Sequence, residues 1–274
     1  MNQETVCFIG GGNMATSLIG GLVANDYDAS CITVSDIETQ KLEKLAADFG
    51  ISTSTDSRAA IRDAKVVILA VKPQVMQSVC EQLADANGAH DCLYISIAAG
   101  IREQEINRWL GGGRAVVRCM PNTPALIQLG ATGMYANSLV DSAQKQLAQA
   151  ILSAVGITVW VKQETELDAV TAISGSGPAY FFYFIELLQE AGKKLGLEEE
   201  AARLLAQQTA LGAASMAQNR DVVELRAQVT SKRGTTEQAI QSFQQNDLAS
   251  LVEKATRAAY DRSVGLARQF GKQS

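Results

Sequence analysis

The chain has 274 residues, enough for about two domains that each bury a hydrophobic core. With 47% hydrophobic and 19% charged residues and only 4 prolines, its composition is that of a globular protein and excludes a disordered or fibrous chain. The net charge of -5 argues against a polyanionic partner, so we expect no binding to nucleic acid.

The sequence also predicts a cytoplasmic protein. Its opening, MNQETVCFIGGG, has no basic and apolar leader, and no later window holds about 18 uninterrupted apolar residues, so we expect neither secretion nor a membrane span. The five cysteines form no C-x-x-C pair and mostly fall in strand-like runs, where cysteine acts as a small buried hydrophobe. The single histidine, His90, lies in a polar stretch, so we expect no metal site and no histidine-based triad.

Residues 1–163 alternate short β-branched runs with helical segments. The expected strands are VCFIG, CITVSD, KVVILAV, CLYISIA, AVVRCM and ITVWV. Such alternation is typical of a parallel, doubly wound sheet covered by helices on both faces. We therefore predict an α/β fold in which residues 1–163 form a Rossmann-like dinucleotide-binding domain.

The first expected strand runs into a glycine-rich loop. Gly10, Gly12 and Ala15 have the G-x-G-x-x-G/A spacing at the opening of a helix. Gly10 permits a tight turn, Gly12 lets the backbone approach a pyrophosphate, and Ala15 lets the helix pack on the strand. Together with Asn13 and Met14, these residues are the predicted cofactor-binding residues of the loop.

Asp36 ends the second expected strand, where an acid can accept hydrogen bonds from the adenosine ribose. By that rule the cofactor is NAD. A carboxylate there would repel the 2′-phosphate of NADP, but Ser35 and neighbouring amides could receive the phosphate if Asp36 turns away. The choice of dinucleotide is open at this point.

Three later loops follow expected strands: AVKPQ (70–74), IAAGI (97–101) and MPNTPA (120–125). Open α/β sheets bind ligands at the carboxyl ends of their strands, so the three loops predict one crevice, although proline or glycine ending a strand explains each alone. The predicted cofactor contacts in these loops are Ala70, Val71, Lys72, Pro73, Ala98 and Asn122.

Residues 164–274 carry a helical pattern without strand signals, and we predict an all-helical domain there. The first helices, at about 167–195, are apolar on nearly every side, which is typical of helices buried against a large partner. A second subunit is the expected cover. Further on, VTSKRGTTEQAI predicts a turn and then a helix from about Thr235, whose free amides suit a carboxylate; a capped helix with Glu237 complementing the dipole is the alternative.

Taken in order, the motifs IGGGNMA, AVKP, MPNTP, ISGSGPAY and VTSKRGTT resemble those of the pyrroline-5-carboxylate reductase family, over the whole chain. The resemblance implies a helical C-terminal domain that interlocks with another subunit, giving a homodimer or a higher oligomer built from dimers. It also implies reduction of 1-pyrroline-5-carboxylate to L-proline, the last step of proline biosynthesis, usually with NADPH. NADH is the alternative donor.

The same resemblance assigns the substrate site. The implied substrate contacts are Glu164, Ser231, Gly234, Thr235 and Thr236. The Thr236 hydroxyl would lie near the ring nitrogen as the catalytic group, and Glu164 would face the substrate amine, although a solvated acid in a first helical turn explains it equally well. The chain departs from the usual Ser-Pro-Gly-Gly-Thr-Thr at Lys232 and Arg233, and arginine adopts a positive φ less readily than glycine.

Two alternatives remain open. The β-hydroxyacid dehydrogenases share the front domain and a similar G-x-G turn, but carry a catalytic lysine four residues after it, where this chain has Phe181. Oxidising an alcohol needs a base for the hydroxyl proton, whereas an imine can arrive already protonated, so the missing lysine favours imine reduction. A non-catalytic dinucleotide-binding sensor is the other alternative.

Overall fold

The computed structural model describes residues 3–86 and 92–271, and His90 lies outside them. The chain divides into two compact units. The first unit consists of the residues up to Ser176 together with those from Ala259 onward. The second unit is Gly177–Ala258. The predicted division at 163/164 falls elsewhere, and as a boundary between domains it stays a prediction.

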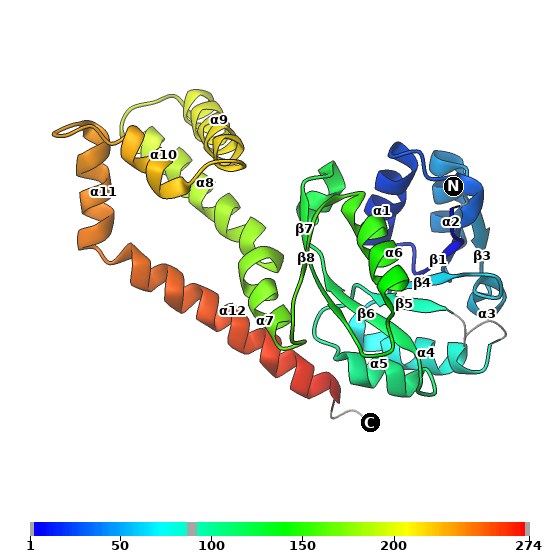
Figure 1. Cartoon of the computed structure of the whole chain (residues 1–274). Helices are drawn as coiled ribbons and strands as arrows, with labels where there is room; N and C mark the ends of the chain where they lie inside the picture. The colour runs from blue at the N-terminus through cyan, green and yellow to red at the C-terminus, as the bar shows by residue number, and fades with distance from the viewer. Residues whose placement is uncertain (1–2, 87–91, 272–274) are drawn as a thin grey trace. The chain divides into compact units, whose positions relative to one another are not determined.

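Within the described part of the first unit, eight strands form one sheet in the order β3-β2-β1-β4-β5-β6-β7-β8 (Figure 1). The strands are β1 (Val6–Ile9), β2 (Ile32–Ser35), β3 (Ser52–Ser54), β4 (Val66–Leu69), β5 (Leu93–Ser96), β6 (Ala115–Met120), β7 (Gly130–Ala136) and β8 (Gly156–Trp160). The order reverses between β1 and β4, as in dinucleotide-binding sheets. The predicted Rossmann-like α/β fold is confirmed.

Two of these strands, β3 and β7, were not predicted from the sequence. The direction of β7 and β8, opposite to that of the other strands, was not predicted either. β3 consists of three polar residues, and β7 is rich in glycine and alanine, so neither carries a β-branched run. β6 and β7 are joined by the short 3-10 helix η3 (Thr123–Ile127), which is too short for a parallel crossover, so β7 pairs antiparallel with β6. Helix α6 (Ser142–Ser153) then crosses over, and β8 pairs parallel with β7.

Alternate residues of the strands build a core on each face of the sheet. Val6 and Phe8 of β1 pack with helices α1 (Asn13–Ala24), α2 (Thr39–Phe49) and α6. Cys7 and Ile9 point the other way, toward α4 (Met76–Ala84) and α5 (Glu103–Trp109), with the short α3 (Ser57–Ala60) beside them. The two helical layers appear on opposite faces of the sheet in Figure 1. Because both faces of the sheet are covered, residues that point either way are apolar, and the central strands are continuous apolar runs.

The cysteines are packing residues in this core. Cys7, Cys80, Cys92 and Cys119 are buried and Cys31 is half-buried, all as free thiols. Burial raises the pKa of the Cys7 and Cys80 thiols to about 12, so both remain neutral and unreactive. The described residues hold no cluster of three or more His, Cys, Asp or Glu that suits a metal ion. Within the same residues, every helix is too short or too polar to cross a membrane.

The predicted all-helical second half is confirmed over the described residues. It starts with α7 (Glu166–Val170) and a π-helical turn, Thr171–Gly175, which both belong to the first unit. The second unit contains α8 (Gly177–Lys194), α9 (Glu199–Ala217), α10 (Val222–Gln228), α11 (Thr235–Gln245) and the start of α12 (Leu248–Gly271). The end of α12 belongs to the first unit, within which Leu266 and Phe270 lie against Gly100.

Candidate active site

The glycine loop after β1 packs closely against the loop after β4. Gly10 has φ +103°, and its N–H donates to the Ser35 carbonyl at 2.8 Å. A Cβ on Gly10 would lie 2.7 Å from the Ala70 carbonyl oxygen and 3.1 Å from the Val71 side chain. The structure thus brings together the glycine loop, the end of β2 and the loop after β4, at the point where the strand order reverses.

Gly12 precedes the first turn of α1 and leaves open space beside it. Its backbone is extended, and a Cβ placed on it would meet nothing within 4 Å. Among the described residues, no hydrogen bond uses the amides of Asn13 or Met14, whereas Ala15 is buried against the sheet. Free amides at a helix N-terminus, next to a gap that any side chain would fill, fit the pyrophosphate of a dinucleotide.

Asp36 lies beside this loop and is held in place by two backbone amides. Its Oδ2 accepts the Gly11 N–H at 2.7 Å, and its Oδ1 accepts the Glu38 N–H at 3.0 Å. Ser35 is buried, and its hydroxyl bonds to that of Ser57 at 2.9 Å. Asp36 therefore does not turn away from the nucleotide loop, and Ser35 is not free to receive a phosphate.

The other predicted cofactor residues line the same edge of the sheet in different ways. Lys72 is exposed and immediately precedes the 3-10 helix η2 (Pro73–Val75). Ala98 is buried in the core beneath α4 and α5. The side-chain amide of Asn122 donates to the Ser174 carbonyl at 3.0 Å and accepts the Ala131 N–H at 2.8 Å, so it ties the end of β6 to β7 and to the π-helical turn.

The ISGSGP segment is helical and contains no sharp turn between α7 and α8. Thr171–Gly175 is π-helical, and the Ser176 N–H donates to the Thr171 carbonyl at 2.8 Å. Gly175 packs on the end of β6, where a Cβ would lie 2.6 Å from Cε of Met120. Pro178 stands in the first turn of α8, where its missing N–H leaves no helical hydrogen bond unmade. Gly175 therefore lies in close contact with the flexible end of the Met120 side chain.

Glu164 takes part in a buried ionic network that the sequence did not reveal. Its Oε1 accepts the Glu103 N–H at 2.6 Å and pairs with Arg118 at 3.0 Å. Burial lowers the pKa of the Arg118 guanidinium, and the charge of Glu164 opposes that shift. These contacts give Glu164 a structural partner on the sheet, while its predicted role toward the substrate amine stays a prediction.

Asp168, one turn further along, is the centre of the same network. Its side chain is 1% exposed, and its two oxygens bond to Arg102 at 2.5 Å and to the Ser263 hydroxyl at 2.7 Å. The network thereby ties α7 and the end of α12 to the residue that precedes α5. The single acid in the mainly apolar LDAVTAI run was the sequence signal that could have pointed to this network.

The predicted substrate turn forms the N-terminus of α11. Gly234 precedes this helix and donates to the Ser231 carbonyl at 2.9 Å, and a Cβ on it would overlap the Ser231 hydroxyl. None of the hydrogen bonds among described residues uses the amides of Thr235 or Thr236. The Glu237 carboxylate accepts the Arg233 N–H at 2.7 Å. The turn therefore presents free donors, as a carboxylate site requires.

Arg233 adopts the left-handed backbone that glycine normally supplies at this place, with φ +60°. We expect Arg233→Gly to raise the unfolding free energy by about 1 kcal/mol, because a side chain in this region is strained. The matched control is Lys232→Gly, since Lys232 does not have a positive φ. Glycine there only adds entropy to the unfolded chain and should lower stability slightly. Denaturant unfolding of both variants checks the difference, and equal effects would contradict it.

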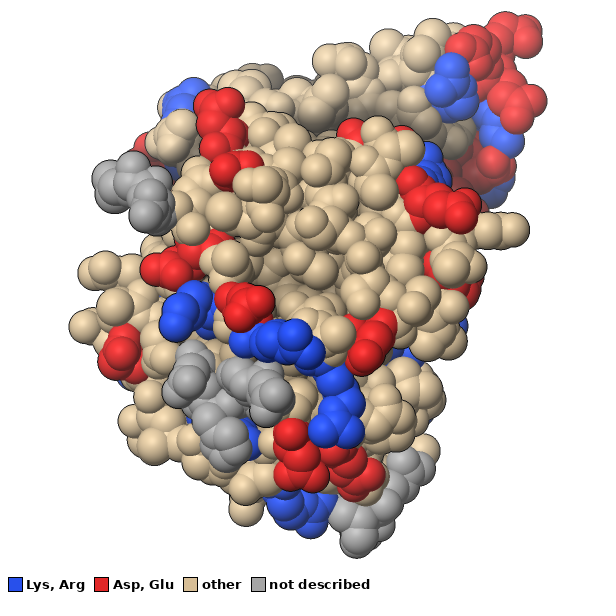
Figure 2. Space-filling model, turned by 90° about the vertical axis from the view of Figure 1, so that its right-hand side faces the viewer, with Lys and Arg blue, Asp and Glu red and all other residues tan. Residues whose placement is uncertain are grey.

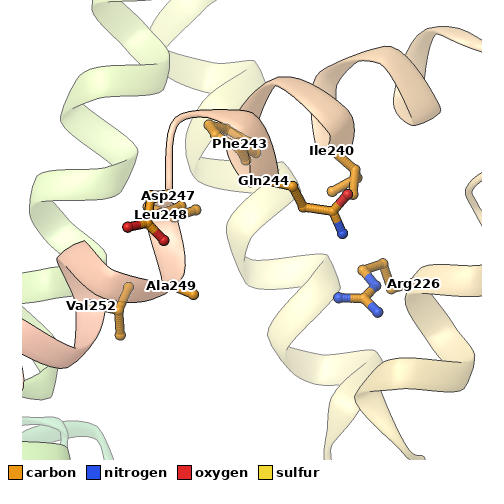
Figure 3. Close-up of a pocket in the computed structure, with 8 residues that line it drawn as sticks. All are labelled: Arg226, Ile240, Phe243, Gln244, Asp247, Leu248, Ala249 and Val252. Atoms are coloured by element: carbon orange, nitrogen blue, oxygen red, sulfur yellow. The ribbon is translucent and has the colours of Figure 1, made fainter.

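A large open cavity belongs to the helical unit. It has a volume of about 620 Å³ and lies among α10, α11 and the start of α12. Figure 3 shows the Arg226 and Gln244 side chains pointing toward the same gap. The remaining lining is mainly apolar, and Phe243 and Val252 are 41% and 55% exposed. Such a surface suits a protein partner better than a polar substrate.

Two family models match the chain. Residues 5–100 match the model described as NADP oxidoreductase coenzyme F420-dependent, and residues 164–266 match the model described as pyrroline-5-carboxylate reductase dimerisation. The first covers the glycine loop and the AVKP loop, and the second covers the helical half. The first model thus contains most of the predicted cofactor contacts, and the second contains the predicted substrate contacts.

Relatives match the chain over nearly its whole length. A pyrroline-5-carboxylate reductase of Pseudomonas aeruginosa is 51% identical over 99% of this chain and 100% of its own. A solved reductase of the same name from Coxiella burnetii superposes with a TM-score of 0.94 at 46% identity, over 97% of this chain and 99% of that one. A Plasmodium falciparum pyrroline carboxylate reductase with NADP bound gives a TM-score of 0.84 at 27% identity, over 97% and 99%. From these matches, the chain belongs to the pyrroline-5-carboxylate reductase family.

Proposed function

We infer that this chain is an NAD(P)H-dependent reductase that converts 1-pyrroline-5-carboxylate to L-proline, the last step of proline biosynthesis. The observation that carries the inference is the full-length match to reductases of that name, 51% identical over 99% of the chain. The geometry agrees, because one chain carries an open pyrophosphate cradle at Gly12 and a turn with free amides at Thr235. A β-hydroxyacid dehydrogenase would share the cradle, but Phe181 stands where its catalytic lysine would be.

The cofactor is held by the first unit. The amides of Asn13 and Met14 would bind its pyrophosphate, and Asp36 would face the adenosine ribose. When bound, NADPH or NADH supplies the hydride that reduces the imine carbon. NADPH is the donor suggested by the relative with NADP bound and by the NADP oxidoreductase family model. The remaining predicted cofactor contacts stay proposals, and Asn122 already uses both ends of its amide within the fold.

The substrate is held by the turn that precedes α11. The amides of Thr235 and Thr236 would bind its carboxylate, which also lies at the positive end of the helix dipole. The Thr236 hydroxyl would hydrogen-bond to the ring nitrogen and orient the imine carbon for attack. Ser231 and Gly234 shape this turn, since the space for a side chain on Gly234 is already filled by the Ser231 hydroxyl.

Thr236→Ala is expected to lower kcat/KM for pyrroline-5-carboxylate at least tenfold, equivalent to about 1.4 kcal/mol of transition-state binding. The reason is loss of the hydroxyl that orients the ring, while the helix itself is unchanged because alanine is a good helix former. Steady-state kinetics at saturating cofactor measures the effect. Thr256→Ala is a matched control, since this hydroxyl bonds to the carbonyls of its own helix. Equal kinetics for Thr236→Ala and wild type would remove Thr236 from the mechanism.

A single assay separates the candidate reactions. Purified protein is mixed with NADPH or NADH and pyrroline-5-carboxylate, and oxidation of the nicotinamide is followed by its absorbance. In parallel, the oxidised cofactors are tested with 3-hydroxy acids. Turnover with the imine alone is the expected result. Turnover with the hydroxy acids alone, or nucleotide binding without any turnover, would replace the proposal with one of its two alternatives.

The helical unit is the proposed dimerisation surface. Phe181, Phe182 and Tyr183 of α8 are 70%, 66% and 60% exposed in the single chain. Adjacent aromatic side chains exposed to this extent are typical of a subunit interface. The family model that matches residues 164–266 is described by dimerisation. We expect a homodimer, or a larger oligomer built from dimers, by light scattering.

Cytoplasmic location and the absence of a nucleic-acid partner stay predictions. The first is supported by the buried free thiols, which suit a reducing compartment. For the second, the face shown in Figure 2 carries acidic and basic side chains side by side around a broad uncharged area. Such a mixed surface attracts a phosphate backbone weakly.

A further inference from the structure

We propose that the last turns of α12, residues 263–270, position the nicotinamide half of the cofactor without touching it. These residues hold the loop after β5, residues 97–101, against which the nicotinamide ring would lie. The proposal rests on the function inferred above, and it gives a positioning role to Ser263 and Phe270, which are far along the chain from every cofactor loop.

The order of the strands assigns the loop after β5 to the nicotinamide side of the crevice. Gly12 at the start of α1 marks the pyrophosphate, and Asp36 after β2 marks the adenosine ribose. β4 and β5 lie on the opposite side of β1 from β2. A dinucleotide that crosses the point of strand reversal therefore places its second ring over the loops that follow β4 and β5. These two loops are adjacent, since the Ile97 N–H donates to the Leu69 carbonyl at 3.3 Å.

The middle of the loop is buried against the end of α12. Gly100 has φ +77°, and a Cβ on it would lie 3.1 Å from Cβ of Leu266 and 3.5 Å from the ring of Phe270. Ala98 and Ile101 are 5% and 0% exposed, and they belong to the core cluster on which Phe270 packs. Because glycine has no side chain, the helix can approach the backbone of the loop directly.

A buried acid ties the same face of α12 to the residue that follows the loop. Ser263, Leu266 and Phe270 are three and four residues apart, so they lie on one face of the helix. The Ser263 hydroxyl donates to Oδ1 of Asp168 at 2.7 Å, and Oδ2 of Asp168 pairs with Arg102 at 2.5 Å. Arg102 directly follows the loop. The helix therefore supports the loop in its middle by packing and at its end through this acid.

The remaining residues of the loop are accessible. Ile97 and Ala99 are only half-buried, whereas Ala98 and Gly100 between and after them are buried. The loop thus offers a surface on which a cofactor ring can lie, while α12 holds it from the buried side. Hydride transfer is sensitive to this support, since a misplacement of about 1 Å can lower the rate about a hundredfold.

The test compares binding of the whole cofactor with binding of a fragment that lacks nicotinamide. Isothermal titration of the full-length protein uses NADP with 2′-phospho-ADP-ribose, and NAD with ADP-ribose. We expect Phe270→Ala to weaken the dinucleotide about fivefold and to leave the fragment unchanged, because only the nicotinamide lies on the loop that loses its support. Phe270→Leu should restore most of the affinity, since leucine fills much of the same space. The matched control is Gln269→Ala, an exposed neighbour in the same turn, which should bind like wild type.

Ser263→Ala provides a second variant, which releases the other contact of α12 and should weaken the dinucleotide alone, by a smaller factor. Thermal unfolding establishes that each variant is folded. Equal weakening of dinucleotide and fragment in the folded variants, or no weakening of either, would overturn the proposal while leaving the reductase function standing. Failure of wild type to bind any of the four ligands would overturn both.

Discussion

Replacing Gly12 with valine is expected to abolish dinucleotide binding while leaving the protein folded. The position has an extended backbone that any residue can adopt, and a Cβ there meets nothing within 4 Å. The fold should therefore tolerate the side chain, apart from a cost of about 1 kcal/mol at the start of α1. The same side chain would fill the gap that the pyrophosphate needs, so we expect affinity for ADP-ribose to fall at least about a hundredfold.

The measurement combines isothermal titration with thermal unfolding. Gly10→Val is the informative comparison, because its φ of +103° and the approach to the Ala70 carbonyl should cost both binding and stability. Gly50→Ala is the control: Gly50 also has a positive φ, +69°, but ends α2 with open space around it. Gly50→Ala should lower the stability of the protein without changing its affinity for ADP-ribose. Normal nucleotide affinity in Gly12→Val would place the pyrophosphate elsewhere.

Asp168→Ala is expected to cost about 3–5 kcal/mol of unfolding free energy. The carboxylate is 1% exposed and bonds to Arg102 and to the Ser263 hydroxyl, so its removal leaves a partly buried cation and a buried hydroxyl without their partner. Asp168→Asn should lose less, because an amide can keep the bond to Ser263. Both variants should loosen the attachment of the end of α12.

Denaturant unfolding at a fixed protein concentration measures this effect, since dimerisation would otherwise shift the apparent stability. Glu200→Gln serves as the control. Glu200 pairs with Arg203 on an exposed helix face, and such surface pairs contribute little. A loss in Asp168→Ala as small as that of the control would show that the network around Asp168 does not hold α7 and α12 to the sheet.

Local sequence determined a large part of this protein. The positions of Gly10 and Gly12 after a β-branched run were sufficient to predict the nucleotide loop, because a tight turn and a helix start depend on neighbours in the chain. Six of the eight strands in the described residues were predicted from their apolar runs. The ordered motifs were enough to predict the family, which the full-length relatives confirm.

Only the tertiary structure decided the features that depend on residues far apart in the chain. β7 reverses direction because η3 is too short for a crossover, and its glycine-rich sequence gives no strand signal. The orientation of Asp36 was open until the Gly11 amide, 25 residues away, proved to hold it. The pairing of Asp168 with Ser263 spans 95 residues. Sequence patterns report local periodicity, whereas a buried charge finds its partner only after the chain has folded.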